Sequence, residues 1–387
     1  MKNRCWVLLV CLLFFIEISG QTFETGQSYF GPNDYVEYIA GDLPVIISAP
    51  HGGDQNPSAI PDRDCNGCVT VSDAFTQELA REIYQALLNK MGCHSHIILN
   101  RLHRRKLDAN RDLDEAANGN TDAAAAWFTY HNFIEAAKTK VIRDFGRGLF
   151  IDLHGHGHTI QRLELGYLLT ASELRESDVQ LNTQTFIENS SLRNLVQENL
   201  NKLSHSELIR GKNSLGSILS DASYPSVPAS DDPFPVSGDA YFSGGYNTER
   251  HGSITSGKID AIQIECNSSV RFNANIRIAF AENIADAIIK YLDAHYFKDF
   301  KNYKCISSIV HKSETFFEIF PNPVIDRLSV KNSRNFELKL SVYDQMGRLI
   351  SSKIGDKMDV SELQQGLYFL KIAQNNTQMT VKKFVKM

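Results

Sequence analysis

The chain has 387 residues, of which 42% are hydrophobic and 22% are charged. This length corresponds to about two or three domains, and the composition suits an ordinary globular core rather than a disordered or collagen-like chain. The 40 basic and 45 acidic side chains give a net charge of −5, which provides no positive field for gripping nucleic acid. These figures exclude a peptide, a basic nucleic-acid-binding protein and a multi-span membrane protein, but they do not separate an enzyme from a binding module.

The N-terminus has the pattern of a secretory signal peptide. An apolar run at residues 6–16 follows Lys2 and Arg4 and leads to small residues at 19 and 20. The run is too short for a membrane span, which takes about 20 residues, and its charged start and small-residue end are those of a cleaved signal. We expect residues 1–20 to be removed and the mature chain to be exported, without a transmembrane segment.

Export changes the interpretation of the cysteines, because exported chains meet an oxidising compartment. Cys65 and Cys68 could form half of a zinc site, but no second pair follows at the spacing of a zinc ribbon, so a local disulfide is favoured. The number of cysteines beyond the signal peptide is odd, so at least one thiol should stay free. These cysteines are Cys65, Cys68, Cys93, Cys266 and Cys305.

Four short apolar runs in the central region predict buried strands, and helical patterns lie between them. The strands are expected at residues 45–48, 96–100, 149–153 and 261–264, and the helices at about 72–91, 127–145 and 276–296. Ser72 is a plausible first cap, and Gly92 and Gly146 are plausible stops. This alternation predicts an α/β fold with a mainly parallel or mixed sheet and helices on both faces.

A polar cluster follows each of the four predicted strands. The clusters are residues 50–54, 101–111, 154–158 and 265–267. Ligands of open α/β sheets bind outside the carboxyl ends of the strands, so we expect the clusters to converge on one crevice. Two histidines and a carboxylate there could hold zinc with an open fourth position, where bound water reaches a pKa near 7 and becomes a nucleophile. His51 with Asp54, and His154, are the candidates.

Five segments, in order across roughly residues 40–295, resemble the N-formylglutamate amidohydrolase family, which has a zinc-carboxypeptidase-like fold. The segments are Ile-Ile-Ser-Ala-Pro-His-Gly-Gly at 46–53, Asp-Ala-Asn-Arg at 108–111, Phe-Ile-Asp-Leu-His-Gly at 150–155, Gly-Gly-Tyr-Asn-Thr-Glu-Arg-His-Gly at 244–252 and Ile-Gln-Ile-Glu at 262–265. The resemblance implies that His51 and His154 are zinc ligands and that Glu265 is the general base. It also implies that Asn110 and Arg111 hold a substrate carboxylate, as the fork of an arginine can do bidentately.

The resemblance does not determine which carboxylate would be the third zinc ligand. A carboxypeptidase-like pattern would have Glu three residues after the first histidine, whereas this chain has the shorter Asp54 there. Asp73, at the start of the predicted helix, is an equal competitor. The chain therefore offers two alternatives for this ligand.

The segment at 214–258 is rich in Ser, Gly, Pro and Asp. A connection of this length inside a compact domain is usually functional or mobile, so we interpret it as a lid that brings Tyr246 and Arg250 to the substrate. Arg250 is a second candidate for clamping the substrate or stabilising an oxyanion, with His251 beside it.

The C-terminal region changes to a period of two, which predicts antiparallel strands in a small β-sandwich. Strands are expected at 336–342, 367–372 and 380–385, with turns at 344–347 and 364–366. Phe-Pro-Asn-Pro at 320–323, Val-Tyr-Asp at 342–344 with Gly-Arg at 347–348, Gly-Leu-Tyr-Phe at 366–369 and the lysines 382, 383 and 386 resemble a type IX secretion C-terminal sorting domain. The alternative is an ordinary adhesive or carbohydrate-binding β-module.

The sequence thus predicts a signal peptide at 1–20, a zinc-dependent amidohydrolase domain at 21–300, a linker at 301–315 and a sorting domain at 316–387. The expected protein is secreted or held at the cell surface through the type IX machinery. It would cleave a C–N amide bond near a free carboxylate, in a small acyl amino acid or a peptide-like substrate, with no nucleic-acid partner. Two alternatives stay open: a zinc exopeptidase or peptidoglycan amidase, and a metal-free surface binding protein on a degenerate hydrolase scaffold.

Overall fold

The computed structural model describes residues 23–65, 67–255, 257–305, 317–332, 338–344, 348–374 and 378–387. The predicted signal peptide lies outside these residues. The chain divides into two compact units, residues 1–306 and 307–387. Within the described residues, no helix has the length and apolar character that crossing a membrane requires.

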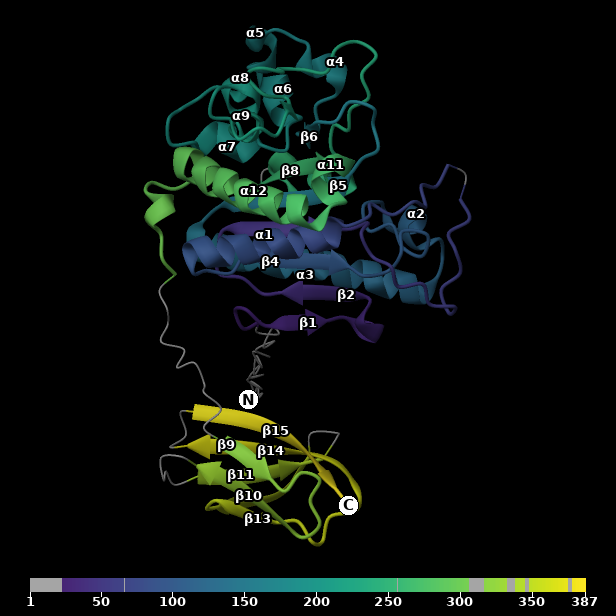
Figure 1. Ribbon diagram of the computed structural model, residues 1–387, viewed down its shortest axis with the longest axis vertical. Helices are drawn as coiled ribbons and strands as arrows, with labels where there is room; N and C mark the ends of the chain where they lie inside the picture. The colour runs from purple at the N-terminus through teal and green to yellow at the C-terminus, as the bar shows by residue number, and fades with distance from the viewer. Residues whose placement is uncertain are drawn as a thin grey trace, which may run out of the picture. The chain divides into compact units, whose positions relative to one another are not determined.

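An eight-stranded mixed sheet forms the centre of the first unit, in the order β1-β2-β4-β3-β5-β8-β6-β7 (Figure 1). Its strands are β1 (Ser28–Phe30), β2 (Val36–Ile39), β3 (Val45–Ala49), β4 (His96–Asn100), β5 (Gly148–Gly155), β6 (Leu163–Gly166), β7 (Ser226–Val227) and β8 (Ile259–Cys266). The four predicted strands, β3, β4, β5 and β8, run parallel, whereas β2 and β6 lie antiparallel to β4 and β8. The predicted α/β fold with a mixed sheet is therefore confirmed.

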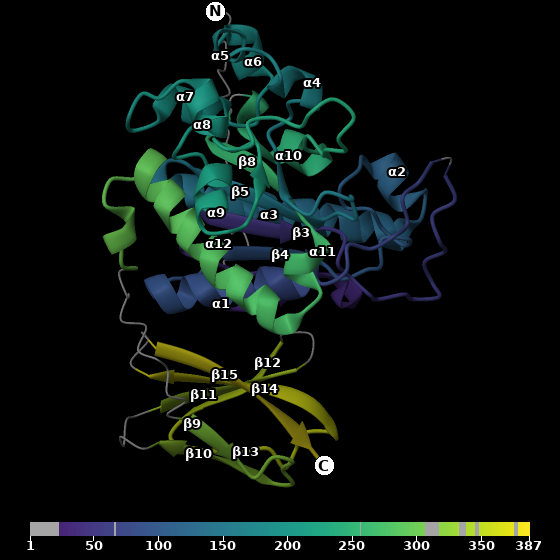
Figure 2. The same cartoon turned by 45° about the horizontal axis from the view of Figure 1, so that its top comes forward.

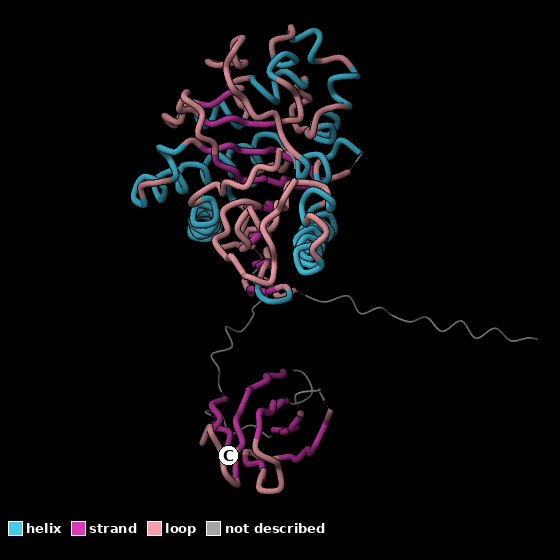
Figure 3. Tube along the Cα trace, turned by 90° about the vertical axis from the view of Figure 1, so that its right-hand side faces the viewer, coloured by secondary structure: helices cyan, strands magenta, loops and turns pink. Residues whose placement is uncertain are grey.

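Long helices cover both faces of this sheet. Helices α1 (Thr76–Met91) and α12 (Ala274–His295) lie side by side on one face (Figure 2), whereas α3 (Thr121–Phe145) covers the other. Neighbouring strand residues divide between the faces, because side chains alternate along a strand: Ile47 packs in the core with α1 and α12, and Ile46 packs in the core with α3. Figure 3 shows the helices on either side of the strands.

The helix ends follow backbone chemistry. Gly92 and Gly146 adopt left-handed φ values of 70° and 78°, and each donates its N–H to a carbonyl four residues earlier, as predicted from their positions. The start of α1 was predicted wrongly at Ser72. Phe75 has a φ of 66°, so the helix begins only at Thr76.

Short helices complete the first unit. They are α2 (Leu113–Ala117), α4 (Ala171–Leu174), α5 (Asp178–Leu181), α6 (Gln184–Glu188), α7 (Arg193–Glu198), α8 (His205–Arg210), α9 (Leu215–Asp221), α10 (Tyr246–His251) and α11 (Ser268–Arg271), with 3-10 turns η1 (Pro32–Asp34), η2 (Ser253–Thr255) and η3 (Phe300–Asn302). Segment 214–258, predicted as one irregular connection, contains α9, β7 and α10. Its irregular part is therefore shorter than expected.

Two disulfides join cysteines of the described part of the first unit. Cys65 pairs with Cys68, as the sequence predicted, and Cys93 pairs with Cys305 across a separation of 212 residues. Cys266 is the free, buried thiol among the described residues.

The second unit contains two antiparallel sheets, in the orders β13-β10-β9 and β12-β11-β14-β15. Its strands are β9 (Phe317–Phe320), β10 (Arg327–Asn332), β11 (Leu338–Tyr343), β12 (Leu349–Ile354), β13 (Lys357–Asp359), β14 (Gly366–Gln374) and β15 (Gln378–Lys386). Leu328, Leu340, Ile372 and Phe384 share its separate core. The small antiparallel β-unit is thus confirmed, while residues 336–337 of the first predicted strand and 345–347 of the turn lie outside the described residues.

Candidate functional site

Three atoms that could bind a metal converge at the carboxyl ends of β3 and β5. Nδ1 of His51 lies 3.1 Å from Nδ1 of His154, and Oδ2 of Asp73 lies 3.3 Å from each of these nitrogens. His51 follows β3, His154 belongs to β5, and Asp73 precedes α1. All three side chains are buried, so the fold holds the three atoms together away from bulk water.

The spacing of these atoms fits a tetrahedral zinc site. Zinc bonds to imidazole nitrogen and carboxylate oxygen of about 2.0–2.2 Å place neighbouring ligand atoms about 3.3–3.6 Å apart. The observed separations of 3.1 to 3.3 Å are close to that edge length. The donor set of two imidazoles and one carboxylate therefore fits zinc with a fourth position left for water or substrate.

The other nitrogen of each imidazole contacts a buried carboxylate. Nε2 of His51 lies 2.6 Å from Oδ1 of Asp108, and Nε2 of His154 lies 2.7 Å from Oδ2 of Asp152. A carboxylate at this distance holds the ring proton on Nε2, which leaves the lone pair of Nδ1 for a metal. These contacts orient both rings toward the same point.

Each of these carboxylates is itself held. Asp108 accepts hydrogen bonds from Nε of Arg104 at 2.9 Å and from the backbone N–H of Asn110 at 3.0 Å. Burial alone would raise the pKa of Asp108, but the neighbouring His51 and Arg104 lower it below its ordinary value. Asp152 accepts from the hydroxyl of Ser48 at 2.5 Å. Both carboxylates are therefore fixed acceptors.

Glu265 lies beside this cluster. It is the register partner of His154 across β5 and β8, so the two residues lie on the same face of the sheet. Its Oε1 accepts a hydrogen bond from Nε2 of Gln263 at 3.0 Å. Burial raises the pKa of Glu265 to about 8, although His154 acts in the opposite direction. A cation beside this carboxylate would favour its ionised form.

A cavity of about 170 Å³ joins these groups. Its walls include His51, Asp73, His154, Glu265, Asn110 and Arg111. Nε of Arg111 donates to Glu115 at 3.0 Å, and its side chain is one-third exposed. The crevice expected from the four polar clusters is therefore present, with the predicted arginine at its wall.

The two alternatives for the carboxylate ligand are placed differently. Asp73 belongs to the cluster, whereas Asp54 is exposed and lies outside both the cluster and the cavity wall. Of the residues predicted to meet substrate, Tyr246, Arg250 and His251 lie outside the wall that the described residues form.

These three residues form contacts elsewhere in the first unit. Nη1 of Arg250 donates to the hydroxyl of Tyr246 at 3.0 Å, and its guanidinium carbon lies 5.1 Å from the centre of the Trp127 ring. His251 is buried between Glu135 and His131, at 3.0 and 2.9 Å.

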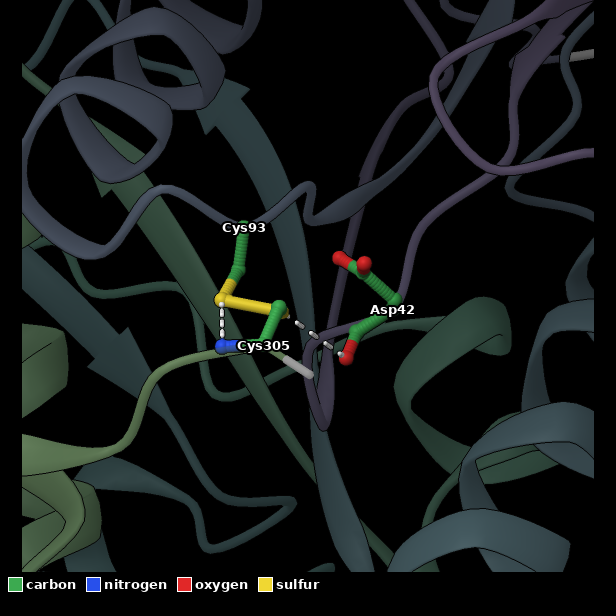
Figure 4. A group of neighbouring side chains, drawn as sticks. All are labelled: Asp42, Cys93 and Cys305. Carbon is green, nitrogen blue, oxygen red and sulfur yellow. Dashed lines mark hydrogen bonds between the residues drawn. A yellow bond between two sulfur atoms is a disulfide. The ribbon is translucent and has the colours of Figure 1, made fainter. Parts of the chain in front are cut away.

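Two further groups of described residues place possible metal ligands close together, and neither has a free donor set. Figure 4 shows Asp42 with Cys93 and Cys305, whose sulfurs are joined in a disulfide and so offer no thiolate. In the other group, of His156, His158 and Glu164, both nitrogens of His156 already have partners. Among the described residues, only the group of His51, Asp73 and His154 presents converging donor atoms that a metal could bind.

Arg271 joins the segments that carry the cluster, and sequence reasoning missed it. Its guanidinium donates to the carbonyls of Ala74, His156 and Cys266, each one or two residues from Asp73, His154 or Glu265. A side chain at position 155 would collide with this guanidinium, so a residue other than Gly155 would displace the arginine from these carbonyls. No local sequence pattern indicates this role, because the arginine contacts carbonyls on three separate segments of the chain.

Asp108 and Asp152 lie within two of the motifs described above, but no role was predicted for either residue. The alternation of a strand was the available signal for Asp152, because residues two apart, such as 152 and 154, share a face. Asp108 contacts a histidine 57 positions away, so no local signal existed for it.

Comparison with known proteins finds a family match in the C-terminal unit. The family described as the secretion system C-terminal sorting domain matches residues 318–387. This confirms the predicted sorting domain, which implies handling by the type IX secretion machinery and secretion to the cell surface or beyond. No curated protein matches the chain.

Several solved structures are similar to about two thirds of the chain. One is the N-formylglutamate amidohydrolase of Ralstonia eutropha JMP134, with 12% identity, a TM-score of 0.38, and coverage of 65% of this chain and 98% of that one. A gene product of Agrobacterium tumefaciens has 14% identity, a TM-score of 0.39, and coverage of 67% and 95%. The succinylglutamate desuccinylase of Chromobacterium violaceum has 10% identity, a TM-score of 0.30, and coverage of 70% of each chain.

Proposed function

We propose that the first unit is a zinc-dependent hydrolase that cleaves a C–N amide bond near a free carboxylate. The observation that carries the proposal is the convergence of Nδ1 of His51, Nδ1 of His154 and Oδ2 of Asp73, with each imidazole held by its own carboxylate. Zinc bound by such a set acts as a Lewis acid and activates water. The sorting domain and the predicted signal peptide support action outside the cell.

Glu265 is the proposed general base. Its carboxylate is buried in the wall of the same cavity and lies on the sheet face that carries His154. From this position it can take a proton from the attacking water and return it to the leaving amine. Water and amide then yield a carboxylate and a free amine, so all atoms are accounted for.

Asn110 and Arg111 are the proposed groups that hold the substrate. Both contribute to the cavity wall, and Arg111 uses Nε for Glu115 and Nη1 for the carbonyl of Asn110. Its Nη2 group is the part of the fork that can reach a substrate carboxylate. Arg250, Tyr246 and His251, placed on α10, would have to act from outside the cavity wall, which makes Arg111 the stronger proposal.

The test combines metal content with activity. In the full-length protein, Glu265→Gln should lower amide hydrolysis at least about a hundredfold, because general-base assistance is lost, while the zinc content stays at the wild-type level. Glu282→Gln is the matched control, because this partly exposed carboxylate pairs with Lys90 and lies outside the cavity wall, and it should change neither quantity. Full activity in Glu265→Gln would exclude the proposed base, and wild-type protein that binds no zinc would instead support a binding protein on this scaffold.

The substrate panel should separate the remaining enzyme alternatives. N-formyl and N-acetyl amino acids, short peptides and cell-wall fragments should be tested side by side. A cavity of about 170 Å³ favours the small acyl amino acids. Preferential cleavage of cell-wall fragments would favour the peptidoglycan amidase.

A further inference from the structure

Glu164 is a fully buried carboxylate next to the proposed general base. It lies in β6 and is the register partner of Glu265 in β8, so the two side chains lie on the same face of the sheet. His154, Glu265 and Glu164 thus form one row across three neighbouring strands. The role proposed above leaves Glu164 unexplained, although burying a carboxylate is costly unless it is paired.

The two oxygens of Glu164 hold two aromatic residues from different loops. Its Oε1 lies 2.7 Å from Nδ1 of His158, and its Oε2 accepts the backbone N–H of Phe242 at 2.8 Å. The rings of His158 and Phe242 stack with their centres 4.7 Å apart and their planes inclined by 19°. One buried carboxylate therefore fixes a stacked aromatic pair.

Phe242 belongs to the wall of the candidate active-site cavity, and 44% of its surface is exposed. Its neighbours in the chain are also anchored: the hydroxyl of Tyr241 donates to the carbonyl of Leu165 at 2.6 Å, and the carbonyl of Ser243 accepts the N–H of Leu168 at 2.6 Å. A single exposed apolar side chain on an unanchored loop is common on protein surfaces and indicates no function. The residues on both sides of Phe242 are instead anchored, at the edge of a cavity whose lining residues are mostly polar.

We propose that the pair of Phe242 and His158 is a subsite for an aromatic or flat apolar group of the substrate. The inference rests on the proposed amide hydrolysis and adds a preference for amides that carry such a group beside the scissile bond. A substrate ring lying on Phe242 would bury apolar surface and stack favourably. Because Glu164 holds the His158 ring and the backbone of Phe242, and the two rings stack on each other, binding would cost little loss of side-chain freedom.

The first test compares substrates on the full-length protein. The ratio of kcat/KM for N-acetylphenylalanine or N-benzoylalanine to that for N-acetylalanine should be about tenfold or more in the wild type, the change expected for a well-placed aromatic contact. Phe242→Ala should bring this ratio close to one. Phe30→Ala is the control, because Phe30 is similarly exposed, at 48%, but lies on edge strand β1, and it should leave the ratio unchanged.

A second test does not depend on catalysis. Calorimetry should show that phenylacetate binds about tenfold more tightly than acetate to the wild type and that Phe242→Ala removes the difference. Equal affinities in the wild type, or a difference that survives in Phe242→Ala, would overturn the subsite. If the affinity difference is present but no amide is cleaved, the proposed hydrolysis fails and the aromatic subsite stands.

Discussion

Nδ1 of His51 lies 3.1 Å from Nδ1 of His154, and when both rings are neutral, with their protons held on the Nε2 atoms by Asp108 and Asp152, each Nδ1 carries a lone pair. The two lone pairs therefore face each other, and Oδ2 of Asp73 adds a third electron-rich atom at 3.3 Å from each. Three such atoms repel one another unless a proton or a metal cation lies between them. This arrangement predicts a strong preference for a divalent metal.

Asp73→Asn should remove most of the bound zinc, whereas Asp54→Asn should leave it in place. Asp73 supplies the carboxylate oxygen of the cluster, while Asp54 is exposed and outside it. The pair is matched, because each change converts one carboxylate into an amide. Elemental analysis after dialysis gives the zinc content of each variant, and zinc lost only from Asp54→Asn would reverse the assignment.

The carboxylates behind the histidines should tune the affinity for zinc. Asp108→Asn and Asp152→Asn should each weaken zinc binding about 10- to 100-fold, because each change loosens one imidazole and weakens its preference for the proton on Nε2. Competition with a coloured chelator measures these affinities. Asp62→Asn is a suitable control, since Asp62 is exposed and pairs with Lys106. Affinities equal to the wild type would show that these contacts do not orient the metal ligands.

The two disulfides should contribute unequally to stability. Replacing Cys93 and Cys305 by serine should lower the free energy of unfolding of the first unit by about 2–5 kcal/mol, because this bridge closes a loop of 212 residues and restricts the unfolded chain. The same change at Cys65 and Cys68, separated by 3 positions, should cost less. Urea unfolding of both double variants gives the comparison, and an equal or reversed order would contradict the loop-closure argument.

Asp260 should make the first unit lose stability as the pH rises from about 4 to 6. Burial raises its pKa from 3.8 to about 6, although Ser253, Asn194, Tyr296 and the N–H of Leu195 donate to it. A folded-state pKa above the unfolded value favours the protonated form, so this stabilisation is complete below about pH 4 and is lost as the pH rises through 6.

Unfolding experiments on the wild type and Asp260→Asn between pH 4 and 6 isolate the contribution of the Asp260 carboxyl to the free energy of unfolding. This contribution should change by a few kcal/mol, on the order expected for its pKa shift. Other titrating groups are common to both proteins and cancel in the difference. A difference that stays constant between pH 4 and 6 would show that Asp260 remains ionised in the folded protein.

Much of the sheet could be predicted from sequence, because its four central strands are continuous apolar runs buried on both faces. The outer strands were missed: β1, β2, β6 and β7 are only 3, 4, 4 and 2 residues long, too short for a periodic pattern. Of the site, the residues that directly follow strands were predicted, since strand ends mark them. The choice between Asp54 and Asp73 could not be made, because it depends on where α1 begins and thus on the backbone at Phe75.

The row of His154, Glu265 and Glu164 also determines where this protein can be altered by insertion or deletion. One residue added within β5, β8 or β6 before its row position would turn that side chain to the opposite face of the sheet, because the faces alternate with every residue. An insertion at residues 157–160, beyond the end of β5, would leave the row in register. Efforts to give the cavity a new substrate should therefore vary the lengths of the loops and keep those of the three strands.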